Sequence, residues 1–150
     1  MANKVDTKLD ENIKNENDIK FKGHFVAATG GRKSAIATVR LYKKGTGIIT
    51  INNKKSNNYF PGEKNNLIRQ PLKLAGGCKD INISIFVKGG GVTGQTDAIK
   101  HALSKALVKL DHELKPILKS KKLLTRDSRI KERKKPGLKK ARRAPQWAKR

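Results

Sequence analysis

Residues 81–110 read INISIFVKGGGVTGQTDAIKHALSKALVKL, and their hydrophobic period changes halfway along. Residues 81–87 alternate apolar with mostly polar side chains, a period of two that predicts a β-strand. Residues 96–110 instead place their alanines, leucines and isoleucine at helical spacing, which predicts an amphipathic helix. A strand followed by a helix across a glycine-rich turn therefore predicts the centre of an α+β domain.

The chain on the N-terminal side of this stretch adds more elements. Residues 35–42 alternate in the same way and predict another strand. The turn residues 44–47, KGTG, lead to residues 48–52, so we expect a β-hairpin here. Leucines and an isoleucine between 67 and 74 predict one or two short helices. Past the long helix, residues 112–118 predict a further helix, with its proline in the opening turn.

The glycine run at residues 89–94, GGGVTG, has the spacing G-x-G-x-x-G of a dinucleotide-binding turn. Such a unit needs a second parallel strand after the helix, with an acidic residue about 20 residues on. Here the helix is followed by Pro116 and a basic tail, which argues against nucleotide binding. Two interpretations stay open and are compatible: a tight turn that needs positive φ, and a close approach of backbone N–H groups to an RNA phosphate.

The charge of the chain indicates its partner. It has 36 Lys and Arg against 12 Asp and Glu, a formal net charge of +24 over 150 residues. An excess of this size favours a polyanion such as nucleic acid. The charge also divides the chain into three predicted parts: a disordered leader at 1–20, a globular α+β domain at 21–118, and an extended basic tail at 119–150 embedded in RNA. The tail has 15 basic and two acidic residues.

Other classes of function are disfavoured. Cys78 is the single cysteine and the three histidines have no zinc-ligand spacing, so we expect no disulfide, metal or cofactor. The histidines, His101 among them, are predicted to be solvated or packed, and the chain is predicted not to be an enzyme. Asp127 and Glu132 are predicted to pair with neighbouring arginines at 126, 129 and 133. No signal-peptide pattern or apolar run of membrane-spanning length occurs, so we expect a cytoplasmic protein.

Several ordered blocks resemble a known family. They are TGGRKSA at 29–35, YF at 59–60, PL at 71–72, GGG at 89–91 with GQ at 94–95, AIKH at 98–101, TRD at 125–127, ERKK at 132–135 and KARRAPQWAKR at 140–150. Together they resemble the ninth protein of the small ribosomal subunit, in its bacterial or organellar form. The sequence departs from that family's usual pattern at Gly31, Thr96, Asp97, Trp147 and Ala148.

The resemblance implies a small mixed sheet packed with helices, similar to the second domain of ribosomal protein five of the small subunit, on the head of that subunit. Its partners would be small-subunit ribosomal RNA, peptidyl-site tRNA and neighbouring head proteins. Arg150 would contact the tRNA directly, with Lys149 as its support. The residues expected to bind ribosomal RNA are Arg32, Lys33, Arg40, Gly89, Gly90, Gly91, Lys100, Arg126, Arg129, Arg133, Lys134, Lys135, Lys139, Lys140, Arg142, Arg143, Gln146 and Trp147.

Two alternatives remain from the residues alone. The basic α+β build also suits a free RNA chaperone or the protein subunit of a ribonucleoprotein enzyme, and the glycine run suits a nucleotide-binding protein. The choice between a bacterial cytoplasm and an organelle stays open.

Overall fold

The computed structural model describes residue 21, residues 23–77 and residues 80–148. The predicted leader, Cys78, Lys149 and Arg150 lie outside these described residues. The elements in chain order are β1 (Phe25–Arg32), β2 (Ala35–Lys43), β3 (Ile49–Ile51), β4 (Lys54–Lys55), α2 (Ser56–Tyr59), α3 (Glu63–Leu74), β5 (Ile81–Lys88), α4 (Val92–Leu110) and α5 (Leu114–Ser120). The predicted α+β class, a mixed sheet packed with helices, is therefore confirmed.

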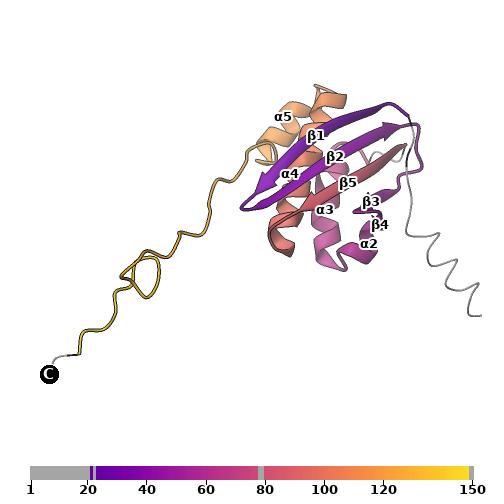
Figure 1. Ribbon diagram of the computed structural model, residues 1–150. Helices are drawn as coiled ribbons and strands as arrows, with labels where there is room; N and C mark the ends of the chain where they lie inside the picture. The colour runs from indigo at the N-terminus through magenta and orange to yellow at the C-terminus, as the bar shows by residue number, and fades with distance from the viewer. Residues whose placement is uncertain (1–20, 22, 78–79, 149–150) are drawn as a thin grey trace, which may run out of the picture.

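The sheet has five strands in the order β1-β2-β5-β3-β4. β2 pairs antiparallel with both β1 and β5, whereas β3 pairs parallel with β5. Figure 1 shows α3, α4 and α5 gathered on one side of the sheet, with the chain after α5 leading away from the domain. One face of the sheet thus lies under helices, and its other face is open.

The strand faces follow the alternation of the sequence. Along β2, Ala35, Ala37, Val39 and Leu41 are fully buried, as the period of two predicts. They meet the buried stripe of α4, which includes Ile99, Leu103 and Leu107. Burying one valine, leucine or isoleucine side chain contributes about 1.5–3 kcal/mol, so this contact between sheet and helix stabilises the fold.

The predicted hairpin between 35–42 and 48–52 is wrong, because β5 lies between β2 and β3. The turn that was expected to join them crosses the start of β5 instead. Gly45 N–H donates to the Asp80 carbonyl at 2.7 Å, and the Asn82 side chain accepts from Thr46 N–H at 2.9 Å. These bonds use the donors that a hairpin turn would have directed back to β2.

The hairpin that does form joins β1 to β2 through Lys33 and Ser34, and sequence periodicity missed β1. Its buried positions hold only Ala28 and Gly30, which carry almost no hydrophobic signal. Their small size lets α4 lie close: a Cβ added at Gly30 would stand 2.5 Å from the Ala98 carbonyl oxygen. The absence of a side chain at Gly30 therefore sets the distance between strand and helix.

Side chains of α4 cover the free edge of β1. Lys109 Nζ donates to the Ala27 carbonyl at 2.9 Å, and Lys105 Nζ donates to the Thr29 carbonyl at 3.0 Å. One turn earlier, His101 Nδ1 accepts from Gly31 N–H at 3.4 Å. Unpaired strand edges invite aggregation, so this row of contacts protects the sheet as well as fixing the helix.

The glycine run forms the predicted tight turn. Gly89 and Gly90 have φ of 73° and 64°, and α4 begins at Val92, four residues before the predicted start. No strand follows Lys88 in the described part of the chain, so the βαβ unit of a dinucleotide fold is missing there. None of the described helices combines the length and apolar character required to cross a membrane.

Candidate RNA interface

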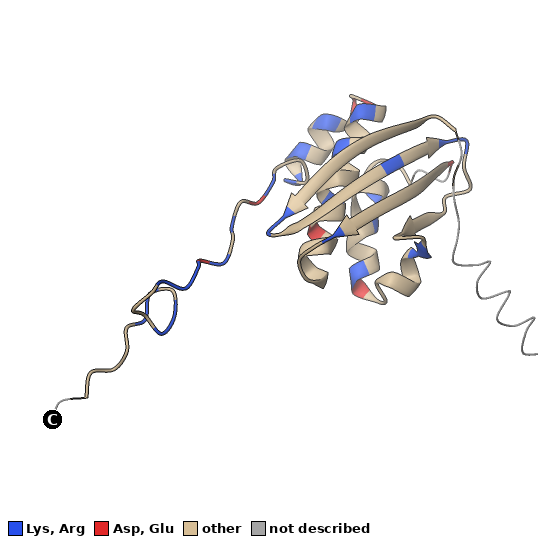
Figure 2. Cartoon of the chain, in the orientation of Figure 1, with Lys and Arg blue, Asp and Glu red and all other residues tan. Residues whose placement is uncertain are grey.

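Figure 2 shows Lys and Arg, in blue, along much of the tail. Residues 121–148 form neither helix nor strand. Each of the predicted RNA-binding positions in its outer part is exposed: Arg133, Lys134, Lys135, Lys139, Lys140, Arg142, Arg143, Gln146 and Trp147. Trp147 is 89% exposed, so its ring is free to stack on a base.

Glu132 organises a local loop inside this cationic segment. Its carboxylate accepts from Arg142 Nε at 2.8 Å and lies 3.0 Å from Lys135 Nζ, and the Arg142 bond lowers the pKa of Glu132 most. A turn at Gly137, whose φ is 78°, brings the two cations together. Glu132 was predicted to pair with neighbouring arginines, but its partners are Lys135 and the distant Arg142.

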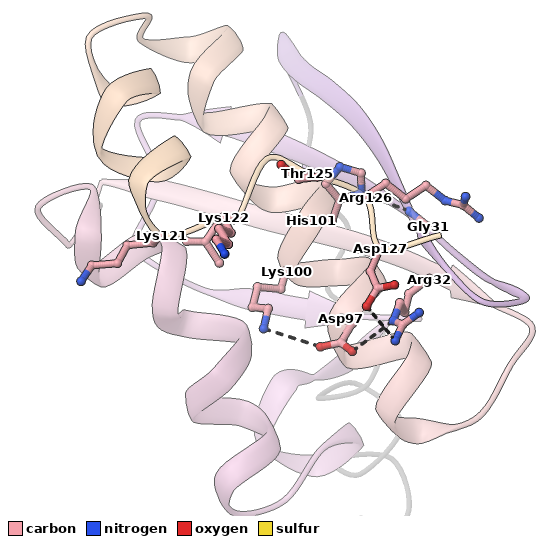
Figure 3. A pocket seen from close by; sticks show the side chains of 11 residues that line it. Gly31, Arg32, Asp97, Lys100, His101, Lys121, Lys122, Thr125, Arg126 and Asp127 are labelled. Atoms are coloured by element: carbon pink, nitrogen blue, oxygen red, sulfur yellow. Dashed lines mark hydrogen bonds and ion pairs between the residues drawn. The ribbon is translucent and has the colours of Figure 1, made fainter. Parts of the chain in front are cut away.

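A hollow of about 200 Å³ lies where the tail leaves the domain (Figure 3). Its walls come from the end of β1, from α4 and from residues 121–127. Leu123 is buried in the core and Leu124 packs against it, so the tail begins inside the domain's hydrophobic contacts. We call residues 123–129 the tail root.

Arg32 joins three parts of this hollow. Its Nη2 lies 3.0 Å from Asp127 Oδ2, and its Nε lies 3.7 Å from Asp97 Oδ2 on α4. Its Nη1 also donates to the Arg129 carbonyl at 2.7 Å. The Arg32 side chain is only 14% exposed, so its positive charge is directed mainly at groups of the protein itself. Lys100 approaches the same Asp97 at 3.5 Å.

His101 holds the tail root from the other side. Its Nδ1 accepts from Gly31 N–H, and its Nε2 lies 3.2 Å from the Leu124 carbonyl. A neutral ring with the proton on Nε2 satisfies both contacts. Desolvation lowers the pKa of His101 below 6.5, Lys105 and Arg126 lower it further by charge, and the Leu124 bond opposes them.

Stability should therefore depend on the protonation of His101. Because its pKa is lower in the folded protein, the unfolded chain takes up the proton first, and the free energy of unfolding falls as the pH drops below 6.5. A His101→Gln variant should lose about 1 kcal/mol at neutral pH, and its deficit should shrink toward pH 5. Denaturant unfolding across this range measures it, with exposed His112→Gln as the control. Parallel curves for wild type and His101→Gln would contradict the assignment.

Predicted RNA-binding residues of two turns come together next to this same end of β1. The turn holding Lys33 lies beside the glycine turn, and both line a shallow hollow with Gly90, Gly91 and the first residues of α4. A Cβ on Gly89 would stand 2.6 Å from the Ser34 carbonyl oxygen. The exposed cation and the bare backbone of two turns thus share one surface.

Arg40 lies apart from these groups, on the open face of the sheet. Its guanidinium carbon is 5.1 Å from the Phe25 ring centroid and 5.8 Å from that of Phe86. Both rings are about half exposed. The structure therefore does not gather all predicted RNA-binding residues into one site, and it distributes them over tail, turns and sheet.

Sequence reasoning missed most of the tail-root contacts. The pairing of Asp127 with Arg129, at 2.6 Å, is confirmed, but its bond to Arg32 joins residues 95 positions apart. Neither periodicity nor local charge patterning carries such a signal, because the contact depends on the tail root meeting the end of β1 in space. Among the described residues, no group of three or more His, Cys, Asp or Glu side chains is placed to hold a metal ion.

The sequence was also compared with known proteins. Residues 30–150 match a family profile described as ribosomal protein S9/S16. A relative from Desulfovibrio desulfuricans, the small ribosomal subunit protein uS9, is 47% identical over 127 residues, which cover 84% of this chain and 97% of that protein.

These matches define the class of the chain: it is a structural protein of the small ribosomal subunit, from a non-enzymatic group. Within that class, the chain belongs to the ribosomal protein S9/S16 family, as the resemblance in the sequence indicated.

Proposed function

We propose that the chain binds small-subunit ribosomal RNA chiefly through its tail and holds peptidyl-site tRNA with the last two residues. The observation that carries this proposal is the tail beyond Arg129, which has ten Lys and Arg residues against one carboxylate, Glu132, and whose described cations are all exposed. Each phosphate that a cation neutralises releases counterions, so binding of such a segment to RNA is favoured. The described residues of its own domain offer no comparable row of anions.

The domain supplies further contacts in this proposal. Lys33 and the glycine turn offer a cation beside open backbone, and Lys100 and Arg126 line the hollow at the tail root. These positions flank the tail at its origin, so RNA that follows the tail meets the domain as well. Neighbouring proteins of the subunit head would pack against the remaining surface, within a cytoplasmic ribosome.

Lys149 and Arg150 lie two and three residues beyond Trp147. In the proposed role they place positive charge on the tRNA backbone. Phosphate contacts of this kind position a partner without reading its sequence, which suits a site that accepts every tRNA.

Replacing Lys149 and Arg150 with glutamine should speed the dissociation of peptidyl-site tRNA from purified small subunits by about tenfold, equivalent to about 1.4 kcal/mol. The matched control replaces Lys139 and Lys140, which removes the same charge from the middle of the tail and should leave tRNA dissociation unchanged. The domain should unfold as before in both variants. Equal tRNA dissociation from wild-type and Lys149/Arg150 variant subunits would remove the tRNA role.

A further inference from the structure

We propose that Arg32 and His101 are positioning residues: they dock the tail root on the domain before the chain meets RNA, and so set the direction in which the tail leaves. The benefit of docking rests on the proposed function, because a tail that binds RNA gains from a fixed starting position. The docking itself is a property of the free protein.

We call Arg32 the clasp of the tail root, because its one guanidinium contacts two tail positions and one helix position. It pairs with Asp127, donates to the Arg129 carbonyl and faces Asp97 on α4. Arginine's planar fork with several donors makes this possible, where lysine offers a single point charge. The Arg32 side chain is largely shielded from water, at 14% exposed, whereas the Asp97 and Asp127 side chains are 35% and 33% exposed.

His101 and Leu123 hold the start of the same segment. Leu123 N–H donates to the Leu118 carbonyl at 3.1 Å and its side chain is 7% exposed, which continues the core one turn past α5. His101 then binds the Leu124 carbonyl while it accepts from β1. Residues 123–129 are therefore held at both ends, by a core contact and by the clasp.

The acidic residues of this region support a docking role over an RNA contact. Asp97 and Asp127 would repel a phosphate backbone if they were free, but both carboxylates face Arg32. Both Asp127 carboxylate oxygens also accept from Arg129 Nε, at 3.0 and 3.1 Å, and Oδ1 accepts from the Arg129 backbone N–H as well. These carboxylates are thus paired with arginines of the same chain. RNA that approaches the tail root would therefore meet its outward-facing cations.

The contacts to the domain end at Arg129. Among the described residues, no hydrogen bond or ion pair joins residues 130–148 to the rest of the domain, and Ile130 is 73% exposed. The tail thus consists of a docked root and an outer part that can follow RNA. A docked root lowers the conformational cost of binding, because fewer residues must be ordered when RNA arrives.

Backbone heteronuclear NOE values of the full-length chain without RNA test the docking. Residues 123–129 should be as rigid as α4, and residues 131–148 should be clearly more mobile. Arg32→Met should release residues 126–129, and Asp127→Asn should release them in part, because the Arg32 bond to the Arg129 carbonyl remains. The double variant should release them no further than Arg32→Met, which already removes the Arg32–Asp127 pair. Asp127→Asn lies outside the packed core, so it gives an answer even where Arg32→Met reduces folding. Arg32→Lys should restore part of the rigidity.

Lys33→Met is the matched control, because it removes one cation next to Arg32 from an exposed turn. It should leave the tail root rigid. A root as mobile as residues 131–148 in the wild type would overturn the proposal, and so would independent, additive effects of the two single variants.

A second readout separates this inference from the proposed function. The rate of association with small subunits that lack the chain should be about tenfold lower for Asp127→Asn than for wild type, although the variant gains no charge repulsion with RNA. If the root is docked but association is unchanged, the direction-setting role is overturned while RNA binding stands. If neither wild type nor variant associates, the proposed function fails and the docking result still holds.

Discussion

The Gly30→Ala variant is expected to be destabilised by about 3 kcal/mol or more, because the new methyl group meets backbone on two sides. A Cβ at this position would stand 2.5 Å from the Ala98 carbonyl oxygen and would also collide with the Ala102 backbone nitrogen. Neither atom can rotate away, so β1 and α4 must separate. Their separation would also pull Lys105 and His101 from the edge of β1.

Gly94→Ala is the matched control for this prediction. Gly94 lies in the first turn of α4, and its added Cβ would find ordinary contacts at 3.5 Å and beyond. Alanine favours a helix over glycine by roughly 0.5–1 kcal/mol, so this variant should keep or slightly gain stability. Denaturant unfolding of both variants measures the difference, and equal stability of the two would show that the strand–helix approach is looser than described.

A chain that ends at Arg129 is expected to lose on the order of 100-fold or more in RNA affinity at 0.1 M salt. The deletion removes ten cations and one carboxylate, lowering the formal net charge by nine. Each lost phosphate contact makes the plot of log affinity against log salt shallower by about 0.7–0.9, so its slope should decrease in magnitude by roughly 5 or more. Titration of small-subunit RNA at several salt concentrations gives both quantities.

Deletion of residues 1–20 is the control for length, since that segment holds four Lys and five acids and contributes no net positive charge. It should leave the salt slope unchanged. The Arg129-terminated domain should unfold with the same free energy within about 0.5 kcal/mol, because surface regions without core contacts contribute little. An unchanged salt slope in the Arg129-terminated chain would mean that RNA binds elsewhere on the protein.

The sequence predicted the elements whose side chains alternate strongly. β2, β5 and the body of α4 follow directly from the spacing of their apolar residues, and the family blocks agree with the fold. It failed where the fold uses small residues or distant partners. β1 carries glycine and alanine at its buried positions, so burial there leaves no hydrophobic pattern. The strand order was missed because it involves contacts between distant residues, such as the bonds that Thr46 and Ile48 N–H donate to Asn82 of β5.

The candidate interface divides in the same way. Charge counting found the tail, because composition alone distinguishes 15 cations in 32 residues. The use of Arg32 could not be predicted, since its local context, two glycines and a lysine, is that of an RNA-binding turn. Only the fold brings it to Asp127, and so a predicted RNA contact also serves as an internal clasp.

Sedimentation tests whether the tail holds this chain in the small subunit through RNA. Small subunits assembled with either the full chain or the chain ending at Arg129 are washed at high salt, and the amount of each chain that travels with the particle is measured. We expect the full chain to stay at stoichiometric level and the shortened chain to be lost. Equal retention of both chains, or release of the full chain, would contradict it.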